Sequence, residues 1–180
     1  LLSFQESAGC NAGGGTAGCI SFGLNIASTY AELDVPINTQ DYADQWVLIT
    51  ATYDGSAKRV YRNGILIGSA SVSGAISQGS ATHFIGSSGG GSEFFQGNID
   101  DVRIYSRALS AAEISELYST NESKVGGSQE TKATDGLVGY WSFNEGTSTY
   151  AGDFSGNKNH GELKDGPAWT NGKLGRALSF

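Results

Sequence analysis

The sequence is poor in residues that define several classes of protein. Its 180 residues include 2 cysteines, 2 prolines, no methionine and only 11 basic residues against 18 acidic ones. The net charge of −7, without any run of Lys or Arg, would repel a nucleic-acid backbone, so we expect no nucleic-acid partner. No apolar run is long enough to cross a bilayer, which predicts no membrane insertion.

The two cysteines, Cys10 and Cys19, enclose the glycine-rich segment NAGGGTAG. Such a segment is flexible enough to bring two sulfur atoms together. A zinc site is the alternative, but it would need two further soft ligands, and His83 and His160 lack a fitting spacing. We therefore expect a Cys10–Cys19 disulfide and an oxidising compartment, which means an extracellular or cell-surface location.

The chain is rich in the residues of turns. It contains 27 glycines, and Ser and Thr are frequent, which favours many short strands and predicts an all-β fold. The clearest local signal is Asn63-Gly64, which is typical of a type I′ turn between paired strands. The predicted strands up to the middle of the chain cover residues 19–28, 29–37, 46–53, 58–68, 83–87 and 94–106.

One short helix is predicted after residue 109. Ser110 can cap its start, with Glu113 as the partner in a capping box, and Leu109 and Ile114 are spaced for a hydrophobic staple. We expect one or two helical turns. Residues 119–135 are almost free of apolar side chains and combine Ser, Thr, Gly and charge, which is typical of a linker.

Further strands are predicted after this polar segment, in LVGYWSFNEG, DFSGNKNHGEL and GRALSF. Together with QWVLITATYDGSAKRVYRNG and GNIDDVRIYSRALSAAEISELY, these segments resemble laminin-G-like domains of the concanavalin A-like lectin/glucanase superfamily. The resemblance implies an antiparallel jelly-roll β-sandwich with one short helix.

The order of these segments differs from that of the family, which places YWSF first and IDDVRIY last. Residues 1–118 therefore resemble the C-terminal portion of one domain, residues 119–135 form the linker, and residues 136–180 resemble the N-terminal strands. The chain is then either a circular permutant of one domain or a piece that spans two tandem repeats.

The resemblance also implies a calcium site. Calcium takes six to eight oxygen ligands, and related domains often hold it with a glycine-kinked loop and an aspartate of the IDDVRIY strand. The corresponding residues here are Asp153, Asn157 and one of Asp100 and Asp101, since neighbours in a strand alternate between faces.

Two structural roles are alternatives to metal binding. Asp153 and Ser155 could close a turn in which the aspartate side chain accepts backbone hydrogen bonds. The paired aspartates could instead form ion pairs with Arg103 or Arg107.

The segment Glu32-Leu33-Asp34-Val35 resembles the start of the glucanase motif of this superfamily. Those enzymes need a second glutamate further along the strand as the general acid/base, and Pro36 and Ile37 stand there instead. We therefore expect no enzyme activity.

Aromatic rings could stack on sugars, as they do on lectin surfaces. We name Tyr30 and the loop residue Trp169 as candidate ligand contacts. Trp46 and Trp141 lie in apolar strands and are expected to fill the interior.

These features predict a non-catalytic extracellular binding or adhesion module of a repetitive surface protein, stabilised by calcium. Its partner would be a glycan or an extracellular protein. The alternative is a structural subunit of an extracellular filament, in which neighbouring copies complete each other's sheets. A glucanase-like hydrolase is the third reading.

Overall fold

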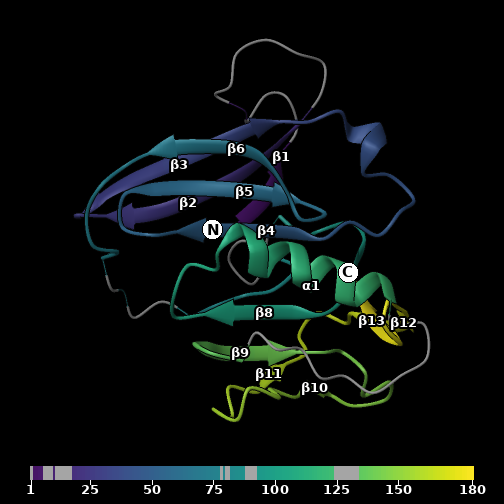
Figure 1. Ribbon diagram of the computed structural model, residues 1–180. Helices are drawn as coiled ribbons and strands as arrows, with labels where there is room; N and C mark the ends of the chain where they lie inside the picture. The colour runs from purple at the N-terminus through teal and green to yellow at the C-terminus, as the bar shows by residue number, and fades with distance from the viewer. Residues whose placement is uncertain are drawn as a thin grey trace. The chain divides into compact units, whose positions relative to one another are not determined.

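The computed structural model describes residues 2–5, 10, 18–77, 79, 82–87, 93–123 and 134–180. The chain divides into two compact units: unit 1 contains residues 1–80 and 107–119, and unit 2 contains residues 81–106 and 120–180. In the described residues every strand pair is antiparallel and one α-helix is present (Figure 1). The predicted all-β class with a single helix is thus confirmed, while jelly-roll connectivity stays a prediction.

Unit 1 contains two three-stranded sheets, β1-β2-β3 and β4-β5-β6. The strands are β1 (Leu2–Gln5), β2 (Cys19–Ile26), β3 (Thr29–Pro36), β4 (Ile49–Tyr53), β5 (Ala57–Arg62) and β6 (Ile65–Ser71), with a short 3₁₀ helix η2 (Thr39–Asp41) between β3 and β4. Apolar side chains of β2, β3 and β5 meet in one buried cluster, so the sheets pack as a sandwich. The cluster comprises Ile20, Phe22, Leu33, Val35, Ile37 and Val60.

The hairpin of β5 and β6 turns at the position that the sequence predicts. Asn63 and Gly64 have φ angles of 50° and 82°, which are the two positive values that a type I′ turn requires. A Cβ atom on Gly64 would lie 3.3 Å from the Cα of Ser115. Glycine therefore also allows the helix to approach this turn closely.

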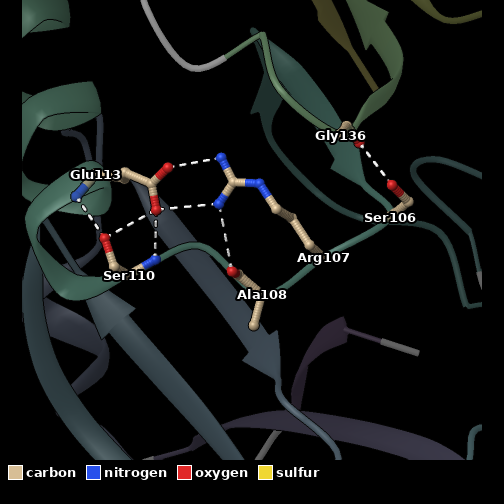
Figure 2. Close-up of polar contacts among 6 residues, drawn as sticks. All are labelled: Ser106, Arg107, Ala108, Ser110, Glu113 and Gly136. Carbon is tan, nitrogen blue, oxygen red and sulfur yellow. Dashed lines mark hydrogen bonds and ion pairs between the residues drawn. The ribbon is translucent and has the colours of Figure 1, made fainter.

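The helix α1 (Ala111–Ser123) begins with the predicted capping box, which Figure 2 shows. The backbone N–H of Glu113 donates to Ser110 Oγ at 3.3 Å, and the backbone N–H of Ser110 donates to Glu113 Oε2 at 2.8 Å. Arg107 adds two hydrogen bonds to the same carboxylate, of 3.1 and 2.6 Å. Chiefly because of Arg107, the pKa of Glu113 falls to about 2.

The helix is longer than the one or two turns predicted. It has 13 residues and continues through Ser123, into the polar segment expected to start at residue 119. The prediction failed because these last residues are polar and give no apolar periodicity, although hydrogen bonding along the helix continues without it.

Unit 2 contains strands from both sides of residues 119–135. Its strands are β7 (Asn98–Ile99), β8 (Val102–Tyr105), β9 (Leu137–Trp141), β10 (Tyr150–Ala151), β11 (Gly161–Glu162), β12 (Ala168–Asn171) and β13 (Arg176–Ser179). β8 pairs with β9, and β7 pairs with β13, so IDDVRIY joins YWSF and ALSF in one unit (Figure 1). The core of this unit comprises Trp141, Phe143, Ala151 and Leu178.

Three sequence expectations need correction. Residues 82–87 carry no strand, because Gly86 has a φ of 84° and bends the chain out of the extended conformation. Trp169 lies in β12 and not in a loop. Trp46 is 37% exposed, because it precedes β4 and no strand turns it inward, whereas Trp141 is buried as expected.

Candidate ligand-binding face

The two faces of the β2–β3 pair differ in character. Ile20, Phe22, Leu33 and Val35 point into the core. Since side chains alternate along a strand, the residues between them share the opposite face. The register places Ser21 opposite Asp34 and Gly23 opposite Glu32. We call this side of the strand pair, which carries Ser21, Gly23, Tyr30, Glu32 and Asp34, the outer face. Ser21 and Gly23 are buried on it, and Tyr30 is exposed.

Tyr30 lies across the glycine of this face. A Cβ atom on Gly23 would lie 2.6 Å from Tyr30 Cζ and would also collide with the hydroxyl group. The Tyr30 hydroxyl donates to Glu32 Oε1 at 3.0 Å. Burial and this carboxylate raise the pKa of Tyr30, so the phenol stays protonated. The ring is nevertheless 52% exposed, so a ligand can reach it.

The other end of the outer face is tied to the disulfide. Ser21 is fully buried and its hydroxyl donates to Asp34 Oδ1. Cys19 Sγ lies 3.5 Å from the same hydroxyl oxygen. Cys10 and Cys19 form the predicted disulfide. This bond therefore fixes the start of β2, from which Ser21 orients Asp34.

Lys58 of β5 reaches the same strand pair from the core side. It is 1% exposed, and its Nζ donates to the carbonyl oxygens of Phe22 at 3.1 Å and Ala31 at 2.7 Å. Burial lowers the pKa of Lys58, while the charges of Glu32 and Asp34 oppose that shift. Sequence analysis missed this residue, although its two-residue spacing from Val60 places it on the core face of β5.

The outer face combines an exposed aromatic ring with the carboxylates of Glu32 and Asp34. Such a ring can pack on a sugar, and the neighbouring carboxylates can accept hydrogen bonds from the sugar's hydroxyl groups. The next position of β3 on this face, two residues beyond Asp34, is Pro36. A second glutamate, which the glucanase motif uses as its general acid/base, is therefore absent from this strand.

The carboxylate of Asp153, in the predicted calcium loop, accepts four hydrogen bonds. Its carboxylate accepts the backbone N–H groups of Tyr140, Ser155 and Asn159 at 2.8–2.9 Å and the Ser155 hydroxyl at 2.9 Å. Burial alone would raise the pKa of Asp153, but these donors outweigh it and lower the pKa to about 2. These four donors give the carboxylate a structural role in the loop. Its predicted role as a metal ligand stays untested.

The side chain of Asn157 also forms hydrogen bonds that hold this loop in place. Its side-chain amide donates to the carbonyl oxygen of Val138 at 3.2 Å and lies 3.1 Å from Ser155 Oγ. The backbone carbonyl of Asn159 accepts a hydrogen bond from Trp141 Nε1 at 2.9 Å. These contacts attach residues 153–159 to β9.

The paired aspartates have different partners. Asp101 has a φ of 56° and forms an ion pair with Arg103 at 2.9 Å. Asp100 Oδ2 accepts the backbone N–H of Leu174 at 2.9 Å, while its Oδ1 is buried without a hydrogen-bond partner in the described residues. Burial raises the pKa of Asp100. This buried carboxylate oxygen of Asp100 is of the type that calcium takes as a ligand.

These residues do not form one side-chain cluster. In the part of the chain that the structure describes, no group of three or more His, Cys, Asp or Glu side chains could hold a metal ion. A cation at Asp100 would therefore rely on backbone carbonyl oxygens, which calcium accepts as ligands.

Trp169 forms its contacts within unit 2. Its indole N–H donates to the carbonyl oxygen of Ser148 at 3.0 Å, and its ring packs against the core. Its predicted role as a ligand contact stays untested, as does that of Tyr30. Of the two side chains, Tyr30 is exposed and Trp169 is half-buried in this structure.

Comparison with known proteins supports the resemblance. A laminin-G-type family model of the concanavalin A-like lectin/glucanases superfamily matches residues 7–115, more than half of the chain. The chain belongs to this superfamily. Neither the curated proteins nor the solved structures that were searched gave a match.

Membership of the family defines a class of function. Laminin-G-like domains are generally non-catalytic modules that bind glycans or proteins, although the superfamily includes glucanases. The family and the Cys10–Cys19 disulfide fit a secreted or surface protein. In the described residues, no helix is long and apolar enough to span a membrane.

Proposed function

We propose that this chain is a non-catalytic extracellular adhesion module that binds a glycan on its outer face. The observation that carries the proposal is the position of Tyr30, whose exposed ring lies across Gly23 with its hydroxyl on Glu32. Glycine at this position leaves room for the ring, and the hydrogen bond holds the end of the side chain in place. A preorganised ring loses little entropy when a sugar packs on it.

The negative charge of the outer face indicates which kind of glycan would bind there. Glu32 and Asp34 are both acidic, and the nearest cation of the described core, Lys58, lies buried beneath them. Sulfated or uronic acid chains would be repelled. We therefore propose a neutral glycan as the ligand. Its hydroxyl groups can donate hydrogen bonds to the two carboxylates.

Changing Tyr30 to Ala is expected to weaken glycan binding by about tenfold or more, because it removes the stacking surface. Gly23→Ala should weaken binding similarly, since its methyl group would push the Tyr30 ring aside. A glycan array followed by calorimetry with the best ligand measures both effects.

Tyr53→Phe is the control for a tyrosine change elsewhere in unit 1, because the Tyr53 hydroxyl donates to Gly74 O and not to the outer face. It should leave the affinity unchanged. Full affinity in both Tyr30→Ala and Gly23→Ala would refute the outer face as the binding site.

Calcium stabilisation belongs to the same proposal, with Asp100 as the side chain that would hold the ion. Calcium would add positive charge beside a buried carboxylate oxygen that has no hydrogen-bond partner in the described residues. A chelator should lower the melting temperature of the native chain. The melting temperature of Asp100→Asn should not respond to it, and an unchanged value for the native chain would exclude this part of the proposal.

A filament subunit is the second candidate function, favoured by β1. This strand is an outer member of the β1-β2-β3 sheet, and Leu2 and Phe4 are 45% and 42% exposed. Such an edge can pair with a strand of another copy. Sedimentation velocity separates the candidates, because a monomer at all concentrations excludes assembly through this edge.

A further inference from the structure

A cavity of about 240 Å³ lies at the turn end of the β5–β6 hairpin in unit 1. Its lining consists of Arg62, Asn63, Ile65 and Ile67. Arg62 pairs with Ile65 in the hairpin, and Asn63 begins the turn between them, so the strand pairing brings these residues together. None of them belongs to the outer face, and the cavity is therefore a separate candidate site. We call it the hairpin cavity.

Two isoleucines form the apolar part of the hairpin cavity. Ile67 is half-buried and packs against the core of unit 1. Ile65 is 70% exposed, so a ligand can reach it from solvent. A ligand that covered Ile65 would remove apolar surface from water, which favours binding. Since a water molecule takes about 30 Å³, the cavity would hold a ligand of about eight non-hydrogen atoms.

The polar side chains of the hairpin cavity supply hydrogen-bond donors. The Arg62 side chain is 29% exposed, its NH2 group donates to the carbonyl oxygen of Asp41 at 2.8 Å, and its guanidinium lies 4.6 Å from the Tyr42 ring centroid. Asn63 Oδ1 accepts the backbone N–H of Leu48 at 2.9 Å, which directs the Nδ2 donors away from Leu48. These contacts hold both donor groups in place before a ligand binds.

The carboxylate of Asp41 would compete with a ligand for Arg62. Its Oδ2 lies 3.7 Å from Arg62 NH1, which is an ion pair but is longer than a hydrogen bond. The Asp41 side chain is 53% exposed, so this pair is solvated and weak. A guanidinium has several N–H donors and can bond to a ligand carboxylate in addition to the Asp41 carbonyl. The net charge of −7 repels anions at long range, but physiological salt screens such repulsion beyond about 8 Å.

We propose that the hairpin cavity binds a small aliphatic carboxylate with a chain of about six carbon atoms. The carboxylate would accept hydrogen bonds from Arg62 and Asn63, and the alkyl chain would pack on Ile65 and Ile67. An ammonium group in the same position would meet the positive charge of Arg62, and an uncharged amide would gain no ion pair. This binding goes beyond the proposed glycan function and does not depend on it.

Amide NMR spectra of the full chain at pH 7 test this proposal. The probes have the same chain length and differ in their head group: hexanoate, hexanamide and hexylammonium. We expect hexanoate to give saturable shifts of the signals of Arg62, Asn63, Ile65 and Ile67. Hexanamide should bind about tenfold more weakly, because hydrogen bonds between two charged groups are stronger than those to an uncharged amide. Hexylammonium should bind more weakly still.

Two variants should change hexanoate binding in opposite directions. Arg62→Gln should weaken it by about tenfold and remove the preference over hexanamide. Asp41→Asn should strengthen it by about threefold, because the competing carboxylate is lost while the backbone carbonyl that holds Arg62 remains. Arg59→Gln is the matched control, since Arg59 also lies on β5 but pairs with Asp54 and does not line the cavity. It should bind hexanoate like the native chain.

The native chain alone can refute the carboxylate assignment, because equal affinity for hexanoate and hexanamide would overturn it. Tighter binding of hexylammonium than of hexanoate would overturn it as well. If no probe shifts the signals of the four lining residues, or if hexanoate shifts only signals elsewhere in the chain, the hairpin cavity is not the binding site.

Discussion

Asp153→Ala is expected to lower the free energy of unfolding of unit 2 by about 3–5 kcal/mol, because it removes a buried charged acceptor of four hydrogen bonds. Three of the four donors are backbone N–H groups, of Tyr140, Ser155 and Asn159. Without the carboxylate these groups lose their partner in a site where Asp153 itself is only 7% exposed. Hydrogen exchange of the Tyr140 and Asn159 amides in urea measures the loss.

The same carboxylate predicts a pH dependence. Its folded pKa of about 2 lies below its ordinary value of 3.8. Its contribution to stability is therefore complete above the ordinary value and is lost as the pH falls towards 2. Asp153→Asn should remove this dependence, while Asp165→Asn, at an exposed aspartate, should retain it. Equal acid sensitivity of the native chain and Asp153→Asn would contradict the assignment.

Lys58→Glu is expected to destabilise unit 1 by about 4 kcal/mol or more, because it would direct a buried carboxylate at two carbonyl oxygens. Carbonyl oxygens donate no hydrogen bond, so the new group would lose its hydration without a partner. The charges of Glu32 and Asp34, which favour a cation at this position, would add repulsion. Urea unfolding with hydrogen exchange of the β2 amides measures the effect.

Lys58→Met separates the effect of the Lys58 charge and hydrogen bonds from the effect of packing its apolar stem. Methionine retains much of the apolar stem but removes both hydrogen bonds to Phe22 and Ala31, so we expect a smaller loss of about 1–3 kcal/mol. Lys158→Glu, at an exposed lysine, should change stability little. A Lys58→Glu chain as stable as the native one would show that the Nζ contacts do not hold the two sheets together.

The features that the sequence predicted well are local ones. The type I′ turn at Asn63-Gly64 depends on the φ angles of two residues, and the capping box depends on Ser110 and Glu113 three positions apart. The disulfide is likewise a short-range contact, since Cys10 and Cys19 are nine positions apart. Each follows from residue chemistry and chain geometry over a few residues, with no need for the remaining fold.

The candidate sites were predicted less completely. Tyr30 and Glu32 were named from the sequence, but the contact between the Tyr30 ring and Gly23 depends on the pairing of β2 with β3. For Asp153 the sequence left two roles open; the structure shows the donors around its carboxylate, and the metal-ligand role stays a prediction.

The sequence by itself determined the strand content, the tight turn, the helix start and the superfamily, because propensity and short-range hydrogen bonding act within a few residues. Only the tertiary structure decided that β8 pairs with β9 across the polar segment and that Lys58 is buried between the sheets. It also decided that Asp101 pairs with Arg103 while Asp100 faces Leu174. These outcomes depend on which distant backbone and side-chain groups share a desolvated space, and that is set by packing of the whole unit.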